Sequence, residues 1–98
     1  MRTITENAIE KFLNAENFKS SNTIVEVLPN VTILKLFGNA IAYRYNDPEK
    51  TLSITNCGYE TATTKERLNA LPNVRINQTK GIWYLNGAEW DGELIDIN

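Results

Sequence analysis

Apolar residues at the start of the chain recur with the period of an α-helix. Residues 4–18, ITENAIEKFLNAENF, place apolar side chains at positions i, i+1, i+4 and i+5, which share one side of a helix. These side chains belong to Ala8, Ile9, Phe12 and Leu13. Thr3 and Glu6 have the spacing of a capping box. The pattern therefore predicts an amphipathic helix over residues 4–18 that begins near Thr3.

The pattern then changes to a period of two, which is typical of half-buried β-strands. Turn signals in LPNV, FGNA and NDPEKT divide this region into strands and set their register. In FGNA, Gly38 comes first in a type II′ turn, so Leu36 faces Ile41, and after NDPEKT Tyr45 faces Leu52. One face of the resulting antiparallel meander is apolar, and we expect the first helix to pack on it. Its residues are Val25, Val27, Leu34, Leu36, Ile41, Tyr43, Tyr45, Leu52 and Ile54.

The second face of this meander is also rich in apolar residues. They are Ile24, Leu28, Val31, Ile33, Phe37, Ala40 and Ala42, mixed with Glu26, Lys35 and Arg44. Such a face is too apolar to stay bare. Two interpretations remain open: the C-terminal hairpin covers it, or it is the contact surface of a homodimer or of another partner.

The segment TATTKERLNAL predicts a second, short helix. Thr63 and Glu66 have the T-x-x-E spacing of a capping box, so Thr63 is the expected N-cap, and Pro72 ends the helix. The residues that share its inward side are Thr64, Leu68 and Leu71. Arg67 is expected at the margin of that side, and Lys65 is expected to face away.

Two further turn signals predict strands near the C-terminus. QTKG indicates a turn closed by Gly81, and LNGA places Asn86 and Gly87 in a type I′ turn. This turn makes Trp83 and Trp90 direct neighbours across a β-hairpin. The fold class predicted from the whole pattern is α+β, with the N-terminal helix packed on an antiparallel β-meander, a short second helix and a C-terminal β-hairpin.

Length and composition agree with one α+β domain over residues 1–98. The 98 residues are 42% hydrophobic and 22% charged, which is typical of a globular protein. No apolar run approaches the roughly 18 residues that a membrane span needs, and the start does not resemble a signal peptide. The lone Cys57 excludes an internal disulfide and favours a reducing cytoplasm.

The composition also removes most catalytic chemistry. The chain has no histidine and one cysteine, so it lacks the commonest general base and cannot assemble a zinc cluster. We therefore expect no enzyme, no cofactor and no metal site, with Cys57 as a small buried residue. Glu89, Asp91 and Glu93 fit one side of a strand, but without calcium-loop spacing they indicate a charged edge strand.

Basic and aromatic residues between positions 65 and 84 suggest a binding strip. Cations beside aromatic rings are typical of surfaces that bind single-stranded nucleic acid. The net charge of −2 argues against a general polyanion binder, so nucleic acid is the alternative interpretation of this strip. The residues predicted to contact a partner are Lys65, Arg67, Arg75, Tyr84 and Trp90.

Nearly end to end, the chain resembles small accessory proteins of tailed phages and prophages. The resemblance is carried by ITENAIEKFLN, NTIVEV, LFGNAIA, ITNCGYETATTKERLNAL and WYLNGAEWDG. Where that group has a tryptophan after CG, this chain has Tyr59. The resemblance implies no activity and no site residues. It implies a context, namely a protein made in the cytoplasm of an infected bacterium.

This context favours a non-enzymatic binding module that acts on a host protein. The most specific version is an anti-defence, anti-CRISPR-like inhibitor. One alternative is a nucleic-acid-binding protein that uses the basic and aromatic strip 65–84. Another is a minor virion or assembly component that works as a homo-oligomer.

Overall fold

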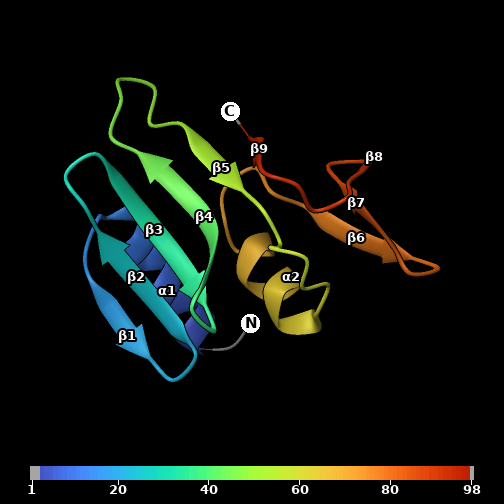
Figure 1. Ribbon diagram of the computed structural model, residues 1–98, viewed down its shortest axis with the longest axis horizontal. Coiled ribbons are helices and arrows are strands. Elements are labelled where there is room, and N and C mark those ends of the chain that lie inside the picture. Colours follow the sequence, from blue (N-terminus) through green and yellow to red (C-terminus); the bar gives the residue numbers. More distant parts are fainter. Residues whose placement is uncertain (1–2, 98) are drawn as a thin grey trace.

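A computed structural model describes residues 3–97, and it confirms the α+β class (Figure 1). The elements in chain order are α1 (Thr3–Leu13), β1 (Phe18–Ser20), β2 (Thr23–Val27), β3 (Val31–Leu36), β4 (Asn39–Tyr45), β5 (Leu52–Ile54), α2 (Ala62–Asn69), β6 (Ile76–Thr79), β7 (Ile82–Leu85), β8 (Ala88–Glu89) and β9 (Ile95–Asp96). The strands form a six-stranded sheet in the order β1-β2-β3-β4-β5-β9 and a three-stranded sheet in the order β6-β7-β8.

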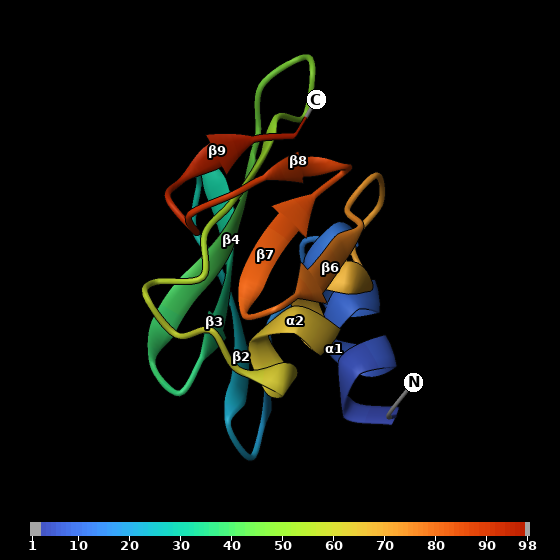
Figure 2. The same ribbon diagram turned by 90° about the vertical axis from the view of Figure 1, so that its right-hand side faces the viewer.

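Both helices and the small sheet lie on the same face of the large sheet (Figure 2). One buried core joins these layers, and it includes Phe12 of α1, Leu34 of β3, Leu68 of α2 and Trp83 of β7. The C-terminal strands therefore pack on the face that was predicted for the first helix. Of the two interpretations of the second face, the one in which the C-terminal hairpin covers it is wrong, and no described element lies over that face.

Helix α1 is shorter than its predicted range of 4–18 because a Schellman motif ends it. Ala15 has a φ of 54°, and the Glu16 N–H donates to the Lys11 carbonyl at 2.9 Å. The chain after this turn forms β1, an edge strand that the helical reading did not predict. Thr3 is the first helical residue, so the cap position falls before the described residues.

The register between β3 and β4 differs from the predicted one. Phe37 and Gly38 have φ values of 51° and 81°, so these two residues, and not Gly38 with Asn39, form a type I′ turn. The register then shifts between Leu34 and Lys35, as at a β-bulge. Ile41 and Ala42, which follow each other in β4, are both buried.

This bulge moves two tyrosines to the other face of the sheet. Ala42, not Tyr43, lies opposite Leu34, and the rings of Tyr43 and Tyr45 stack with centroids 6.2 Å apart. The two tyrosines therefore belong to the second face. The predicted pairing of Tyr45 with Leu52 is wrong for a separate reason. The β4–β5 connection closes where the Tyr45 N–H donates to the Thr51 carbonyl at 2.9 Å, so Arg44 lies opposite Leu52.

Other registers are confirmed. Val25 lies opposite Leu34 as predicted, and the β7–β8 turn has positive φ at Asn86 and Gly87. The two tryptophans meet across this hairpin, with the Trp90 N–H donating to the Trp83 carbonyl at 3.0 Å and ring centroids 6.3 Å apart.

The acidic C-terminal region does not form the single charged strand that was expected. Glu89 ends β8, Asp91 lies outside any strand, and β9 begins two residues after Glu93. Among the described residues, no group of acidic, cysteine or histidine side chains could hold a metal ion. In the same part of the chain, neither helix is long and apolar enough to cross a membrane.

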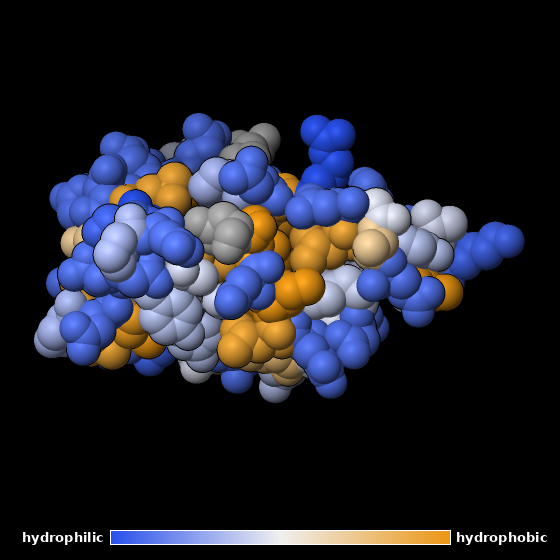
Figure 3. All heavy atoms as spheres, turned by 90° about the horizontal axis from the view of Figure 1, so that it is seen from above, coloured by the Kyte–Doolittle hydropathy of each residue, from blue (hydrophilic) through white to orange (hydrophobic). Residues whose placement is uncertain are grey.

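Apolar residues remain exposed in several places. Figure 3 views the end of the molecule that carries the C-terminal strands, and apolar side chains gather in the middle of this view. Leu94, just before β9, is 58% exposed. Scattered exposed apolar residues are normal on globular proteins. Exposure alone therefore does not identify a functional site.

Candidate functional site

The residues predicted to contact a partner do not form one surface. Lys65 Nζ lies 5.8 Å from the centre of the Trp83 ring and donates to Gln78 Oε1 at 2.9 Å. Gln78 pairs with Trp83, whereas Tyr84 pairs with Asn77. Because neighbouring residues of a strand point to opposite faces, Lys65 and Tyr84 lie on opposite faces of the small sheet.

The other predicted contact residues are also dispersed. Arg75 is exposed, and its backbone N–H donates to Asn86 Oδ1 at 2.9 Å. Trp90 is buried, and its Nε1 donates to the Glu93 carbonyl at 2.9 Å. Arg67 is only 1% exposed. Trp90 and Arg67 thus belong to the folded interior, where a partner does not reach them.

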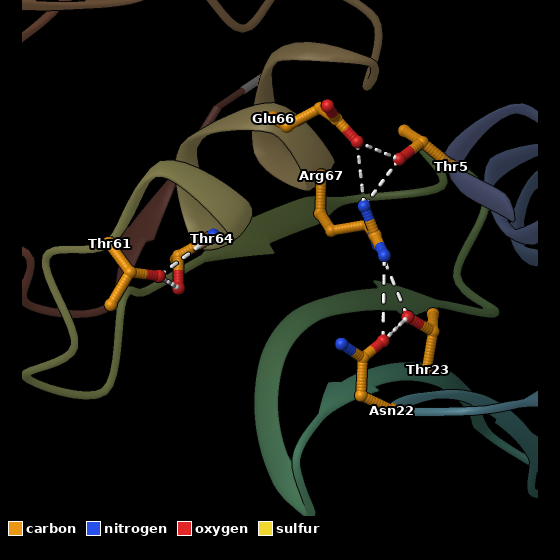
Figure 4. A network of polar contacts seen from close by, with 7 residues as sticks. All are labelled: Thr5, Asn22, Thr23, Thr61, Thr64, Glu66 and Arg67. Atoms are coloured by element: carbon orange, nitrogen blue, oxygen red, sulfur yellow. Dashed lines mark hydrogen bonds and ion pairs between the residues drawn. The ribbon is translucent and has the colours of Figure 1, made fainter. Parts of the chain in front are cut away.

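Arg67 is the centre of a polar network between α1, α2 and the β1–β2 turn (Figure 4). Its Nη1 donates to Glu66 Oε1 at 2.8 Å and to Thr5 Oγ1, and its Nε donates to Thr23 Oγ1 at 3.2 Å. Thr5 in turn donates to Glu66, and Thr23 donates to Asn22 Oδ1 at 2.8 Å. These mutual bonds fix α2 in place. The prediction that Arg67 lies only at the margin of the inward side of α2 is therefore wrong, because its side chain is fully buried.

The N-terminus of α2 is capped by Thr61 and not by Thr63. Thr61 has an extended backbone, and its Oγ1 accepts a hydrogen bond from the Thr64 N–H at 3.1 Å. The helix begins two residues earlier than predicted, which leaves Glu66 to bind Arg67 (Figure 4). The residues predicted to face inward are all buried, namely Thr64, Leu68 and Leu71.

A cleft of about 300 Å³ lies between the β3–β4 turn and the segment that leads from β5 into α2. Figure 2 shows this segment projecting on the same side of the molecule as the β3–β4 turn. The cleft is lined by Leu36, Phe37, Asn39, Ile41, Asn56, Tyr59, Thr61 and Thr64. None of these residues is charged. The lining is apolar with a few amide and hydroxyl groups, as is typical of ligand pockets.

Phe37 stands at the edge of this cleft in an unusual conformation. It is 71% exposed, and its φ of 51° is one that bulky residues rarely adopt. Asn86 holds the same position in the β7–β8 turn, where its side chain binds the backbone of Asn73 and Arg75. The Phe37 ring can make no such hydrogen bond, so the side chain of Phe37 does not stabilise its turn in this way.

Tyr59 lines the same cleft and is 55% exposed. A tight turn with positive φ at Cys57 and Gly58 places it, and the Tyr59 N–H donates to the Asn56 carbonyl at 2.8 Å. The Cys57 thiol donates to the Ala40 carbonyl, which ties this turn to β4. Desolvation raises the pKa of the Cys57 thiol, which keeps it a donor. The prediction that Cys57 is buried is wrong, because the residue is exposed.

Asn56 supplies the buried polar group of the cleft. It is 2% exposed, and its Oδ1 accepts the Gly58 N–H at 2.8 Å. Its Nδ2 has no hydrogen-bond partner within residues 3–97. Gly92 packs against this amide so closely that an added Cβ would lie 2.2 Å from Nδ2. Asn56 therefore lines the cleft and also carries a buried hydrogen-bond donor without a partner among residues 3–97.

Sequence reasoning named Phe37 only as part of the second face and missed Asn56, Tyr59 and Thr61. The FG pair in LFGNA was the available signal, because a bulky residue before glycine in a hairpin turn conflicts with local preference. The residues that line the cleft offer apolar, amide and hydroxyl groups.

Comparison with known proteins places the chain among viral proteins. The family model described as Kyanoviridae Gp96 protein matches residues 1–96. The chain belongs to this family. It is therefore a phage protein, as the resemblance implied, and the family is one of cyanophages. Neither the curated proteins nor the solved structures contain a match.

Proposed function

We propose that this Gp96-family protein is a non-enzymatic binding module that acts on a host protein in the infected cyanobacterium. It engages that protein through the cleft between Phe37 and Tyr59. Anti-defence, anti-CRISPR-like inhibition is the most specific form of this proposal, since occupying a host protein requires no catalytic residues and no cofactor.

The exposed ring of Phe37 carries the proposal. A bulky residue with positive φ costs conformational energy, and such costs persist mostly where they serve a function. Interface hot spots concentrate in aromatic residues that fill pockets, and Tyr59 lines the same cleft. Two exposed aromatics around an uncharged pocket suit a protein surface better than a phosphate backbone.

Nucleic-acid binding through the strip 65–84 has less support. Arg67 is buried, and Lys65 already contacts Trp83 and Gln78. Tyr84 faces the other side of the small sheet. A phosphate-binding surface needs several accessible cations on one face, and these residues do not supply one.

The test compares Phe37→Asn with Leu28→Asn in affinity capture from cyanobacterial lysate, with and without nuclease. Asn suits the first position of a type I′ turn, so Phe37→Asn should fold. Leu28 is an exposed apolar residue at the opposite end of β3 and serves as the matched control. We expect one host protein to be retained by the wild type and by Leu28→Asn, and to be lost with Phe37→Asn.

Other outcomes contradict the proposal in different ways. Recovery that disappears after nuclease treatment would favour the nucleic-acid alternative. Recovery of the bait without any lysate protein would contradict a host-protein partner. Equal capture by both variants would remove the cleft as the binding site.

A further inference from the structure

We infer that the cleft receives a single large apolar or aromatic side chain of the partner polypeptide, and that an uncharged carbonyl oxygen next to it accepts a hydrogen bond from Asn56 Nδ2. This inference rests on the proposed function, because it names what the host protein inserts. It adds the chemical class of the group that enters the cleft, and it names Asn56 as the residue that recognises the group.

The unused Asn56 donor is the first observation. Buried side-chain donors nearly always have a partner, and leaving one unmade is costly. Asn56 is 2% exposed and lines the cleft, yet its Nδ2 has no partner in the described chain. The amide cannot simply turn over, because its Oδ1 accepts the Gly58 N–H. A ligand oxygen would complete this group.

The N-terminus of α2 is the second observation. Thr61 and Thr64, which form the cap and first turn of this eight-residue helix, both line the cleft. The backbone N–H groups at a helix start give that end a partial positive charge, which attracts an oxygen acceptor. The hydroxyls of Thr61 and Thr64 lie 3.0 Å apart and bind each other. The first turn of α2 and Asn56 therefore line the same cavity.

The charge around the cleft favours a neutral acceptor over an anion. The lining holds no lysine or arginine, and Glu60 directly precedes the Thr61 cap. A phosphate or carboxylate would find no cation in the lining to balance its charge. A backbone carbonyl carries no net charge, so Glu60 does not oppose it.

The volume of the cleft and the residues that line it suit a single side chain of the partner. A volume of about 300 Å³ lies at the lower end for ligand pockets, so the cleft does not suit a dinucleotide or a lipid. Leu36 and Ile41 are buried apolar walls, and Phe37 and Tyr59 stand exposed beside the opening. An aromatic side chain in the cleft would contact these apolar atoms. The partner backbone that carries the side chain would then lie next to Asn56 and the first turn of α2.

The test uses two probes that share a ring and differ in the acceptor. N-acetyl-tryptophanamide carries an indole beside two amide carbonyls, and 3-methylindole carries the indole alone. Each is titrated into ¹⁵N-labelled protein, and dissociation constants are taken from the shifts of the Asn56 side-chain amide and of the Thr61 and Thr64 backbone amides. We expect N-acetyl-tryptophanamide to bind about three- to tenfold more tightly, the ratio that one net hydrogen bond provides.

Two variants locate the effect. Asn56→Asp keeps an oxygen for the Gly58 N–H but replaces the donor, so the preference for N-acetyl-tryptophanamide should vanish. Phe37→Asn removes an aromatic wall, so both probes should weaken while the preference stays. If Asn56→Asp does not fold, the ratio of the two dissociation constants measured with the wild-type protein still tests the inference.

The inference is overturned by equal wild-type affinities for the two probes, or by shifts that map outside the cleft. It is also overturned if N-acetyl-tryptophanamide binds the cleft but does not displace the captured host protein. The proposed function fails separately, when Phe37→Asn still captures the host protein. A host protein lost on Phe37→Asn, together with probes that do not discriminate, leaves that function standing and removes only the role of Asn56.

Discussion

Replacing Arg67 separates a structural arginine from a partner-binding one. The sequence places Arg67 in a basic strip that suggests an interface, whereas the structure buries it among Thr5, Thr23 and Glu66. We therefore expect Arg67→Ala to destabilise the fold strongly.

The size of the effect follows from the groups left behind. Breaking a buried ion pair by removing one partner costs about 3–5 kcal/mol. The Glu66 side chain is 28% exposed, so water can partly solvate its carboxylate and the lower end, about 3 kcal/mol, is expected. Domains of this size have unfolding free energies of about 5–15 kcal/mol, so Arg67→Ala should lose a large fraction of the total.

Two further variants divide this loss into parts. Arg67→Met keeps the apolar stem and removes the guanidinium, so it should recover the packing share of the loss. Arg67→Lys keeps the charge but lacks the planar fork that reaches Thr5, Thr23 and Glu66 together. We expect both to be more stable than Arg67→Ala and less stable than the wild type.

Urea unfolding followed by tryptophan fluorescence measures these differences. Trp83 and Trp90 are buried in the shared core, so their emission should report on global unfolding. A common slope against urea is needed before midpoints are compared. The reasoning is refuted if Arg67→Ala unfolds within about 0.5 kcal/mol of the wild type, the range of ordinary surface substitutions. Loss of host-protein capture by such a stable variant would return Arg67 to the interface.

Three smaller predictions test the local structure. Gly87→Val should lower the urea midpoint more than Gly87→Asn, because a β-branched residue strains a turn position with φ of 91°. Thr61→Ala should cost about 0.5–2 kcal/mol in the same assay, and Thr63→Ala should cost little, since Thr61 is the N-cap. The raised pKa of Cys57 keeps the thiol protonated as pH rises past its ordinary value, so iodoacetamide should label the native protein more slowly at pH 8–9 than the urea-unfolded chain. Equal labelling rates would contradict that shift.

The parts of the fold that sequence predicts best are those set by local chemistry. The Asn86–Gly87 turn requires positive φ at two residues that readily adopt it, so the hairpin and its tryptophan pair follow directly. The β3–β4 register depends instead on a bulge. The inserted residue Ile41 and its neighbour Ala42 are both buried, which a strict alternation cannot express. One shift of this kind moves the later side chains of β4, Tyr43 and Tyr45 among them, to the other face.

The site was harder to predict because its parts meet only after folding. Arg67 reads as a surface cation until Thr5 and Thr23, far away in sequence, supply its partners. The cleft likewise joins the turn at Phe37 to the segment at Asn56. Neither segment has a sequence motif of its own. The composition of the chain also cannot show that Asn56 Nδ2 is buried without a hydrogen-bond partner.

Stability and the proposed binding therefore involve different parts of the region around α2. Arg67, in the second half of the helix, fixes it against α1 and the sheet, while Thr61 and Thr64 present its first turn to the cleft. A rigid support of this kind holds a binding group in place without spending affinity on ordering it. Variants of Arg67 should weaken binding only in proportion to the unfolded fraction, whereas Phe37→Asn should weaken it in a fully folded protein. Binding that falls in Arg67→Lys while the protein remains folded would show that the two roles are coupled through the position of α2.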